Sequence, residues 1–162
     1  MILSIVGPSG SGKTTLITKL VPILKKAGLR VAVVKKVHED FEIDKEGKDS
    51  HRIFCSGADI AIFSSKKLAL IKRAEDEDLD SIVVRYLPGY DLILTEGFRD
   101  AKKPRIVFLN HEDEIDMYGQ GEILAVICDK PVDGFLCFRR DEVERIADFI
   151  LSLLKSKKFC ES

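Results

Sequence analysis

The chain has 162 residues, of which 45% are hydrophobic and 33% are charged. This length suits one domain with an ordinary hydrophobic core, and the composition excludes a largely disordered chain. Lysine and arginine together number 26 and aspartate and glutamate 27, which leaves a net charge of −1. A near-neutral chain has no overall attraction to nucleic acid or to anionic lipid, so neither is an expected partner.

Neither a membrane span nor a metal-binding cysteine cluster is predicted. The longest apolar runs, such as residues 1–6, fall far short of the ~20 residues that a membrane-spanning helix needs. A glycine-rich motif begins at Gly7, so no cleavable leader is expected and the protein is predicted to be cytoplasmic. The cysteines have no CxxC pair and no finger-like spacing to histidine, which favours idle thiols in a reducing cytosol: Cys55, Cys128, Cys137 and Cys160.

The start of the chain predicts a strand, a loop, a helix and a second strand. Residues 1–6 form a short apolar run that ends at glycine, as a buried parallel strand does. Apolar residues at helical spacing predict a helix over Thr15–Ala27, with a kink at Pro22 and an end at Gly28. The valine-rich segment Leu29–Lys36 predicts a second buried strand, which completes a βαβ unit.

A polar loop over residues 37–50 and a short helix that ends at Cys55 come next. The runs Asp59–Ser64 and Lys67–Lys72 are too close together for a crossover, so we expect an antiparallel pair and therefore a mixed sheet. The remaining segments predict, in order, a helix, four strands and a final helix: Ser81–Leu87, Asp91–Thr95, Arg105–Leu109, Ile123–Cys128, Phe135–Phe138 and Asp141–Lys155. Asp141 is the expected N-cap of the last helix, and residues 156–162 are expected to form a tail.

One motif carries the chemistry of the chain. Residues 7–14 match G-x-x-x-x-G-K-[ST] and lie between a predicted strand and a predicted helix. Glycines let the backbone approach an anion, and the amino end of the helix adds its positive dipole. We expect Lys13 to reach the β- and γ-phosphates, Thr14 to bind Mg²⁺ through its hydroxyl, and Thr15 to lie near the α-phosphate. The predicted nucleotide-binding residues are Gly7, Pro8, Ser9, Gly10, Ser11, Gly12, Lys13, Thr14 and Thr15.

The motif and the order of elements together predict the fold class. It is α/β, a P-loop NTPase three-layer fold with a mostly parallel, mixed β-sheet. We expect a single nucleotide-binding domain over residues 1–155. The alternative interpretation of the motif is that its glycines only form a tight turn.

Two carboxylates are predicted to hold Mg²⁺ together with Thr14. Glu96 directly follows the apolar run 92–95, so it emerges at the carboxyl end of a strand, where open α/β sheets place their ligands. Asp49 ends the loop after the second strand and can turn toward the metal. The alternatives are a surface glutamate before a turn and a simple helix cap. Asp44 is a weaker candidate, which could hold a metal-bound water.

Asp129 is a candidate for reading a guanine base, although the guanine-reading pattern N-K-x-D is absent, and the residues alone leave the choice between GTP and ATP open. This residue follows a buried strand and precedes Pro131. A carboxylate accepts hydrogen bonds from the N1–H and the exocyclic amine of guanine, whereas adenine offers no such pair of donors at that edge. The alternative is a turn-forming aspartate before proline.

Further segments extend the phosphate loop into a more selective pattern: Val34–His38 leading to Asp44, Gly47–Ser50, Arg52–Ala58, Asp91–Arg99 and Lys103–Ile106. With them, most of the chain resembles the MobB family, the molybdopterin-guanine dinucleotide biosynthesis protein B. The phosphate loop alone is shared by thousands of proteins, but G-K-D-S followed by S-G-A and E-G-F-R is far more specific. The chain departs from the family in the loop after the second strand, where a cluster of histidines is replaced by His38 alone.

The resemblance implies a cytoplasmic, Mg²⁺-dependent GTP-binding protein, a homodimer with weak GTPase activity. Such a protein assists the guanylyltransferase that joins GMP to molybdopterin, and molybdopterin itself is a further expected ligand. Arg52 and Arg99 would add positive charge near the phosphates or the pterin. The nucleotide and metal residues carried over by position are Gly10, Gly12, Lys13, Thr14, Thr15, Asp49 and Glu96.

Two other functions compete with a slow GTPase that acts as an accessory protein. A small-molecule kinase would pass the γ-phosphoryl group to an acceptor hydroxyl, and it would need an arginine-rich lid, for which Arg139 and Arg140 are the nearest candidates. An interaction protein would use the nucleotide for stability alone. If hydrolysis occurs, Lys13, Thr14 and Glu96 are the expected catalytic residues, and turnover should be slow because no glutamine or lysine–glutamate pair that orders water is evident.

Overall fold

The computed structural model describes residues 1–37, 41–42, 45–73, 78–110 and 112–160. The chain forms two compact units, each with its own sheet. The first unit comprises Met1–Lys36 and Val83–Ser162, and the second unit comprises Val37–Ile82. The boundary falls within helix α3 (Leu79–Tyr86). The first unit contains the glycine-rich loop.

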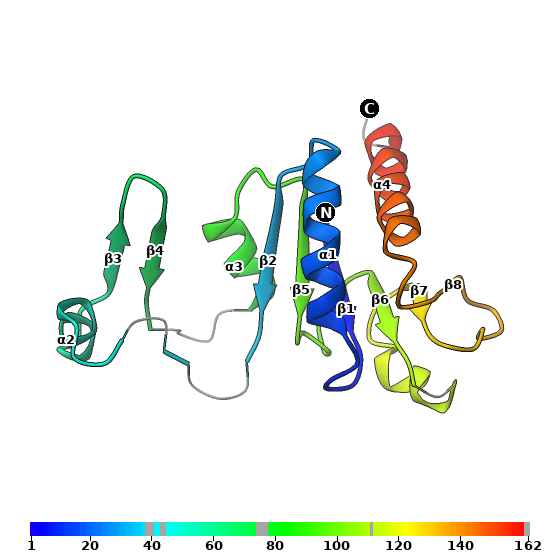
Figure 1. Cartoon of the computed structure of the whole chain (residues 1–162), viewed down its shortest axis with the longest axis horizontal. Coiled ribbons are helices and arrows are strands. Elements are labelled where there is room, and N and C mark those ends of the chain that lie inside the picture. The colour runs from blue at the N-terminus through cyan, green and yellow to red at the C-terminus, as the bar shows by residue number, and fades with distance from the viewer. Residues whose placement is uncertain (38–40, 43–44, 74–77, 111, 161–162) are drawn as a thin grey trace. The chain divides into compact units, whose positions relative to one another are not determined.

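The sheet of the first unit has six strands in the order β2-β5-β1-β6-β7-β8, and all neighbours are parallel (Figure 1). Such a sheet requires crossover connections, and it brings the carboxyl ends of all its strands to one edge. The α/β fold is therefore as predicted. The strands are β1 (Ile2–Val6), β2 (Val31–Lys35), β5 (Leu92–Glu96), β6 (Arg105–Phe108), β7 (Ile123–Ile127) and β8 (Cys137–Phe138).

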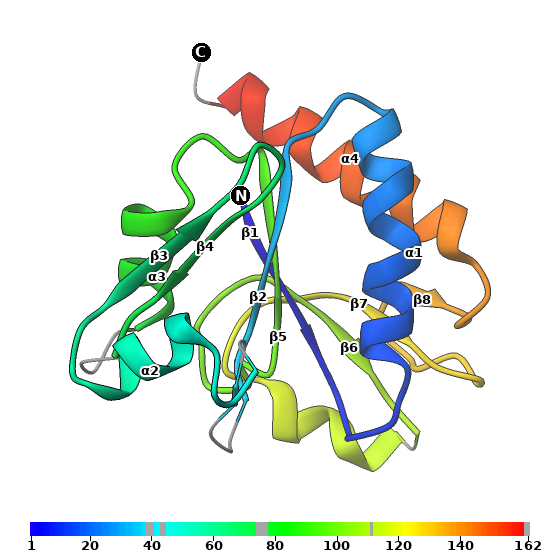
Figure 2. The ribbon, with the colours of Figure 1, turned by 60° about the vertical axis from the view of Figure 1, so that its left-hand side comes forward.

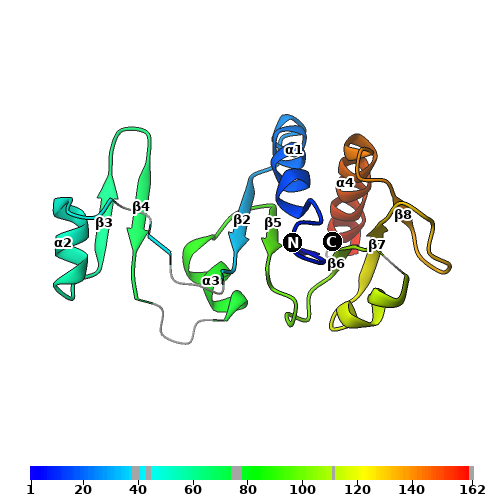
Figure 3. The ribbon, with the colours of Figure 1, turned by 60° about the horizontal axis from the view of Figure 1, so that its bottom comes forward.

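Helical segments cover both faces of this sheet. Helices α1 (Lys13–Lys26) and α4 (Val143–Cys160) lie side by side on one face, and the 3₁₀ segment η1 (Glu112–Tyr118) lies on the other (Figure 3). Alternate residues of the buried strands supply the two cores, as the two-residue period of a strand requires. Ile106 packs with the helix pair, whereas Val107 packs with the η1 side. Among the described residues, no helix is both long and apolar enough to cross a bilayer.

The second unit is a short helix followed by a hairpin (Figure 2). Helix α2 (Asp49–Cys55) packs beside β3 (Ile60–Phe63), which pairs with the antiparallel strand β4 (Leu68–Ile71). The antiparallel pair is confirmed, but the expectation that it makes the main sheet mixed is wrong, because the pair forms a two-stranded sheet of its own. The two strands of a hairpin pair with each other and need no third strand, so their sequence alone does not show whether they join the main sheet.

Both ends of the last helix differ from the predictions. Helix α4 begins at Val143, so Asp141 does not cap it. Instead, Glu142 Oε2 accepts a hydrogen bond of 2.7 Å from the backbone N–H of Arg139, which lowers the pKa of that carboxyl. The helix also continues past Lys155 to Cys160, so most of the predicted tail is helical. Cys55, Cys128 and Cys137 are free thiols.

Candidate functional site

The glycine-rich loop has the backbone that its sequence predicts. Gly7, Gly10 and Gly12 all have positive φ, at 145°, 72° and 101°. A Cβ atom on Gly7 would lie 2.6 Å from the Cβ and 2.7 Å from the carbonyl oxygen of Phe108. Glycine is therefore required there both by the backbone conformation and by the close approach of β6. The loop leads directly into α1, whose N-cap is Gly12.

Lys13 folds back over this loop. Its Nζ donates to the carbonyl oxygens of Gly7 at 3.1 Å and Pro8 at 2.5 Å, and lies 3.5 Å from Ser11 Oγ. Burial is the main reason that the pKa of the Lys13 ammonium is lowered. The nearby Glu96 carboxylate raises that pKa, whereas the like charges of Arg99 and Lys35 lower it. The ammonium is thus held against the carbonyl oxygens of the loop, with the Glu96 carboxylate as the charge that acts on it most strongly.

Thr14 and Glu96 meet at the carboxyl end of β5. The Thr14 hydroxyl donates a hydrogen bond of 2.7 Å to Glu96 Oε1. The Glu96 side chain is largely buried, and its Oε1 also lies 3.8 Å from Lys35 Nζ. Glu96 is the last residue of β5, paired with β1 and β2, so its position is fixed by the centre of the sheet. The structure brings together Lys13, Thr14 and Glu96, as the sequence predicts.

The oxygen atoms of Thr14 and Glu96 fit a magnesium ion. Two adjacent ligands of octahedral Mg²⁺, each at 2.0–2.1 Å from the metal, lie about 2.9 Å apart, close to the 2.7 Å that separates these two oxygens. Because the hydroxyl hydrogen points to Glu96, a lone pair of the hydroxyl oxygen is left for a cation. Among the described residues, no group of three or more His, Cys, Asp or Glu forms a metal cluster. Magnesium usually completes its shell with water and phosphate oxygens.

Two other predicted residues, Asp49 for the metal and Arg52 for the phosphates or the pterin, belong to the second unit. Asp49 is the first residue of α2 and Lys48 is its N-cap, so the interpretation of Asp49 as the helix cap is wrong. Its binding of Mg²⁺ stays a prediction, as does a role for Arg52 within the same helix. Asp44 and His38 lie outside the described residues.

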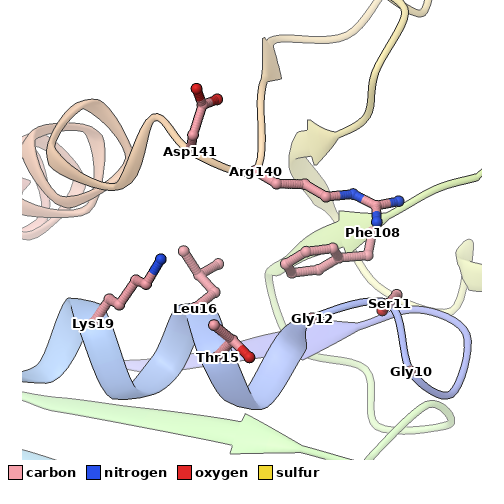
Figure 4. A pocket seen from close by; sticks show the side chains of 9 residues that line it. All are labelled: Gly10, Ser11, Gly12, Thr15, Leu16, Lys19, Phe108, Arg140 and Asp141. Atoms are coloured by element: carbon pink, nitrogen blue, oxygen red, sulfur yellow. The ribbon is translucent and has the colours of Figure 1, made fainter.

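A pocket of about 360 Å³ adjoins the loop (Figure 4). Three of its residues stand on α1, and Phe108 and Arg140 come from the ends of β6 and β8 opposite. A volume of this size is at the lower end of ligand pockets. The lining consists of Gly10, Ser11, Gly12, Thr15, Leu16, Lys19, Phe108, Arg140 and Asp141.

Asp129 lies next to this pocket through Arg140. The side chain of Asp129 is 82% exposed, and its Oδ1 is 4.0 Å from Arg140 Nε. Arg140 Nη2 also donates to Asn110 Oδ1 at 2.9 Å. Asp129 is not among the residues that line the pocket, but Arg140, which lines it, contacts both side chains. All three residues follow strands at the carboxyl edge of the sheet.

Sequence reasoning missed one buried charge beside the site. Arg105, at the start of β6, is fully buried, and burial lowers the pKa of its guanidinium. The guanidinium donates to four backbone carbonyl oxygens, those of Arg99, Ala101, Lys103 and Tyr118. The only sequence signal is a charged residue at the head of an apolar strand, which normally indicates an exposed strand end.

Most of the chain is similar to known proteins. The family model described as "Molybdopterin guanine dinucleotide synthesis protein B" matches residues 2–129. Molybdopterin-guanine dinucleotide biosynthesis adapter proteins of Escherichia coli and Haemophilus influenzae are 32% and 34% identical to the chain. These matches cover 96% and 92% of this chain and 94% and 86% of the relatives. A crystal structure of molybdopterin-guanine biosynthesis protein B is 56% identical, with a TM-score of 0.86, over 96% of this chain and 99% of that one.

Proposed function

Because the chain belongs to the molybdopterin guanine dinucleotide synthesis protein B family, we propose that it serves molybdopterin-guanine dinucleotide biosynthesis as a GTP-binding adapter. In this proposal the adapter binds GTP with Mg²⁺, hydrolyses it slowly, and assists the cytoplasmic guanylyltransferase that joins GMP to molybdopterin. The relatives from Escherichia coli and Haemophilus influenzae carry the description of adapter proteins for this biosynthesis. Membership of the family supports the biosynthetic pathway, whereas the proposal of GTP binding and hydrolysis is argued from the residues of the site.

The observation that carries the proposal is the meeting of Lys13, Thr14 and Glu96. A loop with three positive-φ glycines leads into the amino end of α1, where backbone N–H groups and the helix dipole favour a phosphate. Lys13 already holds its ammonium against two carbonyl oxygens of that loop. The hydroxyl of Thr14 and the carboxylate of Glu96 are spaced for Mg²⁺, which would neutralise charge on the β- and γ-phosphates.

The pocket beside the loop supports a nucleoside on the α4 side of the site. It is continuous with the loop through residues 10–12. In this proposal Asp129 reads guanine from the rim, because its exposed carboxylate is free of any close hydrogen bond to Arg140, which stands at 4.0 Å. Arg140 is held by Asn110 and does not stand on a separate lid, which favours nucleotide binding over the kinase alternative.

A homodimer is the second part of the proposal. The hairpin of the second unit exposes apolar side chains on paired positions, with Phe63 opposite Leu68. An isolated two-stranded hairpin is at best marginally stable in water, so an apolar cover would stabilise it. We assign that cover to a second copy of the chain.

The test is calorimetric binding of GTP and ATP with and without Mg²⁺, followed by analysis of the products. We expect GTP to bind more tightly than ATP, Mg²⁺ to strengthen binding, and GDP to form slowly. Lys13→Ala should weaken GTP binding by about 100-fold or more, because a charge-assisted contact from a half-buried ammonium to two phosphates is lost. Glu96→Gln should reduce the effect of Mg²⁺ while leaving metal-free binding nearly unchanged.

Lys26→Ala is the matched control, since Lys26 is an exposed lysine in the last turn of the same helix. If Lys13→Ala binds GTP as well as Lys26→Ala does, the site is wrong. The kinase interpretation would replace the GTPase interpretation if the γ-phosphoryl group is transferred to molybdopterin or to another added acceptor, and if no GDP forms when the acceptor is left out.

A further inference from the structure

Three positive side chains, those of Lys13, Lys35 and Arg99, share the single carboxylate of Glu96 beside the glycine-rich loop. Lys13 and Lys35 both lie beside Glu96, which is the one carboxylate among the described residues whose charge acts on Lys13. Arg99 follows Glu96 by three residues, a stretch of chain that spans at most about 10 Å. Its positive charge acts on Lys13 more strongly than that of Lys35 does. Like charges held this close are costly unless an anion joins them.

The guanidinium of Arg99 is supported by an aromatic ring. Its Cζ lies 4.9 Å from the centre of the Tyr118 ring, and its Nη2 donates to the Tyr118 hydroxyl at 3.3 Å. Tyr118 is buried. Within the part of the chain that the structure describes, Arg99 forms no ion pair with a carboxylate. The ring therefore orients the guanidinium without neutralising it.

Arg105 fixes the backbone on both sides of this contact. Its Nη1 donates to the carbonyl oxygen of Arg99 at 3.0 Å and to that of Tyr118 at 2.9 Å. The loop after β5 is thereby tied to the end of η1. A Cβ on Gly121 would lie 2.9–3.0 Å from the Arg105 guanidinium nitrogens, so glycine leaves the space that this group fills. The guanidinium of Arg105 thus donates to backbone carbonyl oxygens and holds these two segments of the backbone in place.

We propose that Arg99 binds the terminal phosphate of the nucleotide, with Tyr118 and Arg105 as its positioning residues. The inference rests on the proposed function, because it needs a triphosphate in the loop. A planar guanidinium can donate two parallel hydrogen bonds to a phosphate. This one is oriented by Tyr118 and follows by three residues Glu96, whose carboxylate accepts a hydrogen bond from Thr14 at the start of α1. This contact makes the protein distinguish a triphosphate from a diphosphate.

The test compares the full-length protein's affinity for the β,γ-imido analogue of GTP and for GDP, both with Mg²⁺, by calorimetry. For Arg99→Ala we expect the analogue to bind about 10-fold or more weakly, the loss typical of a hydrogen bond to a charged group. GDP should change by less than about 2-fold. Arg99→Lys should restore part of the loss, because the charge returns without the planar fork.

The positioning residues are tested by the same ratio of affinities. Arg105→Lys and Tyr118→Phe should lower the preference for the analogue while Arg99 remains in place. A merely structural role would weaken both ligands equally and leave the ratio unchanged. Arg30→Ala is the control, since Arg30 precedes β2 and lies at the amino edge of the sheet.

The possible outcomes separate the two proposals. If wild-type protein binds the analogue and GDP but Arg99→Ala affects both equally, or neither, the assignment of Arg99 is overturned and the nucleotide site stands. If wild-type protein binds neither ligand, both proposals are overturned. A selective loss for the analogue in Arg99→Ala supports the inference.

Discussion

The two units of the chain differ in what surrounds their sheets. In the first unit, β6 and β7 are buried on both faces, beneath α1 and α4 on one and η1 on the other. In the second unit, the hairpin exposes its apolar side chains, with Phe63 81% and Leu68 74% exposed. The difference teaches that the buried core and the proposed nucleotide site both belong to the first unit, whereas the second unit exposes an apolar hairpin surface.

The tyrosines allow the two units to be followed separately. All three lie in the first unit, at positions 86, 90 and 118, and the chain has no tryptophan. Tyrosine fluorescence therefore reports the unfolding of the first unit alone. Substitutions in either unit can be judged by whether this signal moves.

The largest effect is expected for Gly7→Ala. The new methyl group would meet β6 at 2.6 Å, and alanine disfavours the positive φ. These two costs together should lower the free energy of unfolding of the first unit by about 3–4 kcal/mol. Chemical denaturation followed by tyrosine fluorescence measures the loss.

Gly57→Ala is the matched substitution in the second unit. Gly57 also has positive φ, at 110°, but no atom lies within 4 Å of the place that an added Cβ would take. The strain is then about 1–2 kcal/mol and local, and the tyrosine transition should not shift. If Gly57→Ala shifts that transition as far as Gly7→Ala does, the two units are not independent.

The next effect concerns the hairpin surface. In Phe63→Ser, an exposed aromatic side chain on β3 is removed, which should weaken the proposed dimer by about 2 kcal/mol, or roughly 30-fold. Sedimentation velocity over a range of concentrations measures the dissociation constant. Stability of the first unit should stay the same.

Val84→Ser provides the comparison, because Val84 is 77% exposed but belongs to the first unit. It should leave dimerisation unchanged. If both substitutions weaken the dimer equally, association depends on exposed apolar side chains in general and not on the hairpin. If Phe63→Ser leaves the dimer unchanged, the hairpin is not part of the interface.

The smallest effect is a pH dependence at the start of α4. The backbone hydrogen bond from Arg139 lowers the pKa of Glu142, with a further contribution from the Arg145 side chain. A carboxylate whose pKa is lower in the folded state stabilises above its unfolded pKa, and this is lost as pH falls through the folded value. The stability of wild-type protein relative to Glu142→Gln should therefore shrink on acidification.

Thermal unfolding of both proteins from neutral pH down to pH about 3 gives this difference, with Glu144→Gln as the control on the same helix turn. A difference that grows as pH falls would contradict the lowered pKa of Glu142.

The parts of the site that the sequence predicted are those that local pattern specifies. Lys13 and Thr14 belong to a contiguous motif, and Glu96 ends an apolar strand. In a parallel sheet the carboxyl ends of strands share an edge, so predicting the strands also predicts that these residues gather. Only the pairing of β1 with β5 had to be assumed.

The parts that were missed depend on contacts between distant segments. No local pattern shows that Arg105 donates to carbonyl oxygens on two separate loops. The start of α4 was misplaced by two residues, and the hydrogen bond that Glu142 accepts from the N–H of Arg139 lies ahead of the helix, where no helical pattern indicates it. The hairpin was assigned to the wrong sheet because alternation of apolar residues does not name a strand's neighbours.

The uniform direction of the six strands in the first unit has a practical consequence for labelling. The turn around Gly89 joins α3 to β5 at the amino edge, opposite the edge of the phosphate loop. A fluorophore attached at Pro88 would report whether the first unit is folded, but its signal should not change when the proposed nucleotide binds. A fluorophore attached at Lys130, which follows β7 at the carboxyl edge of the sheet, should change its signal when the proposed nucleotide binds.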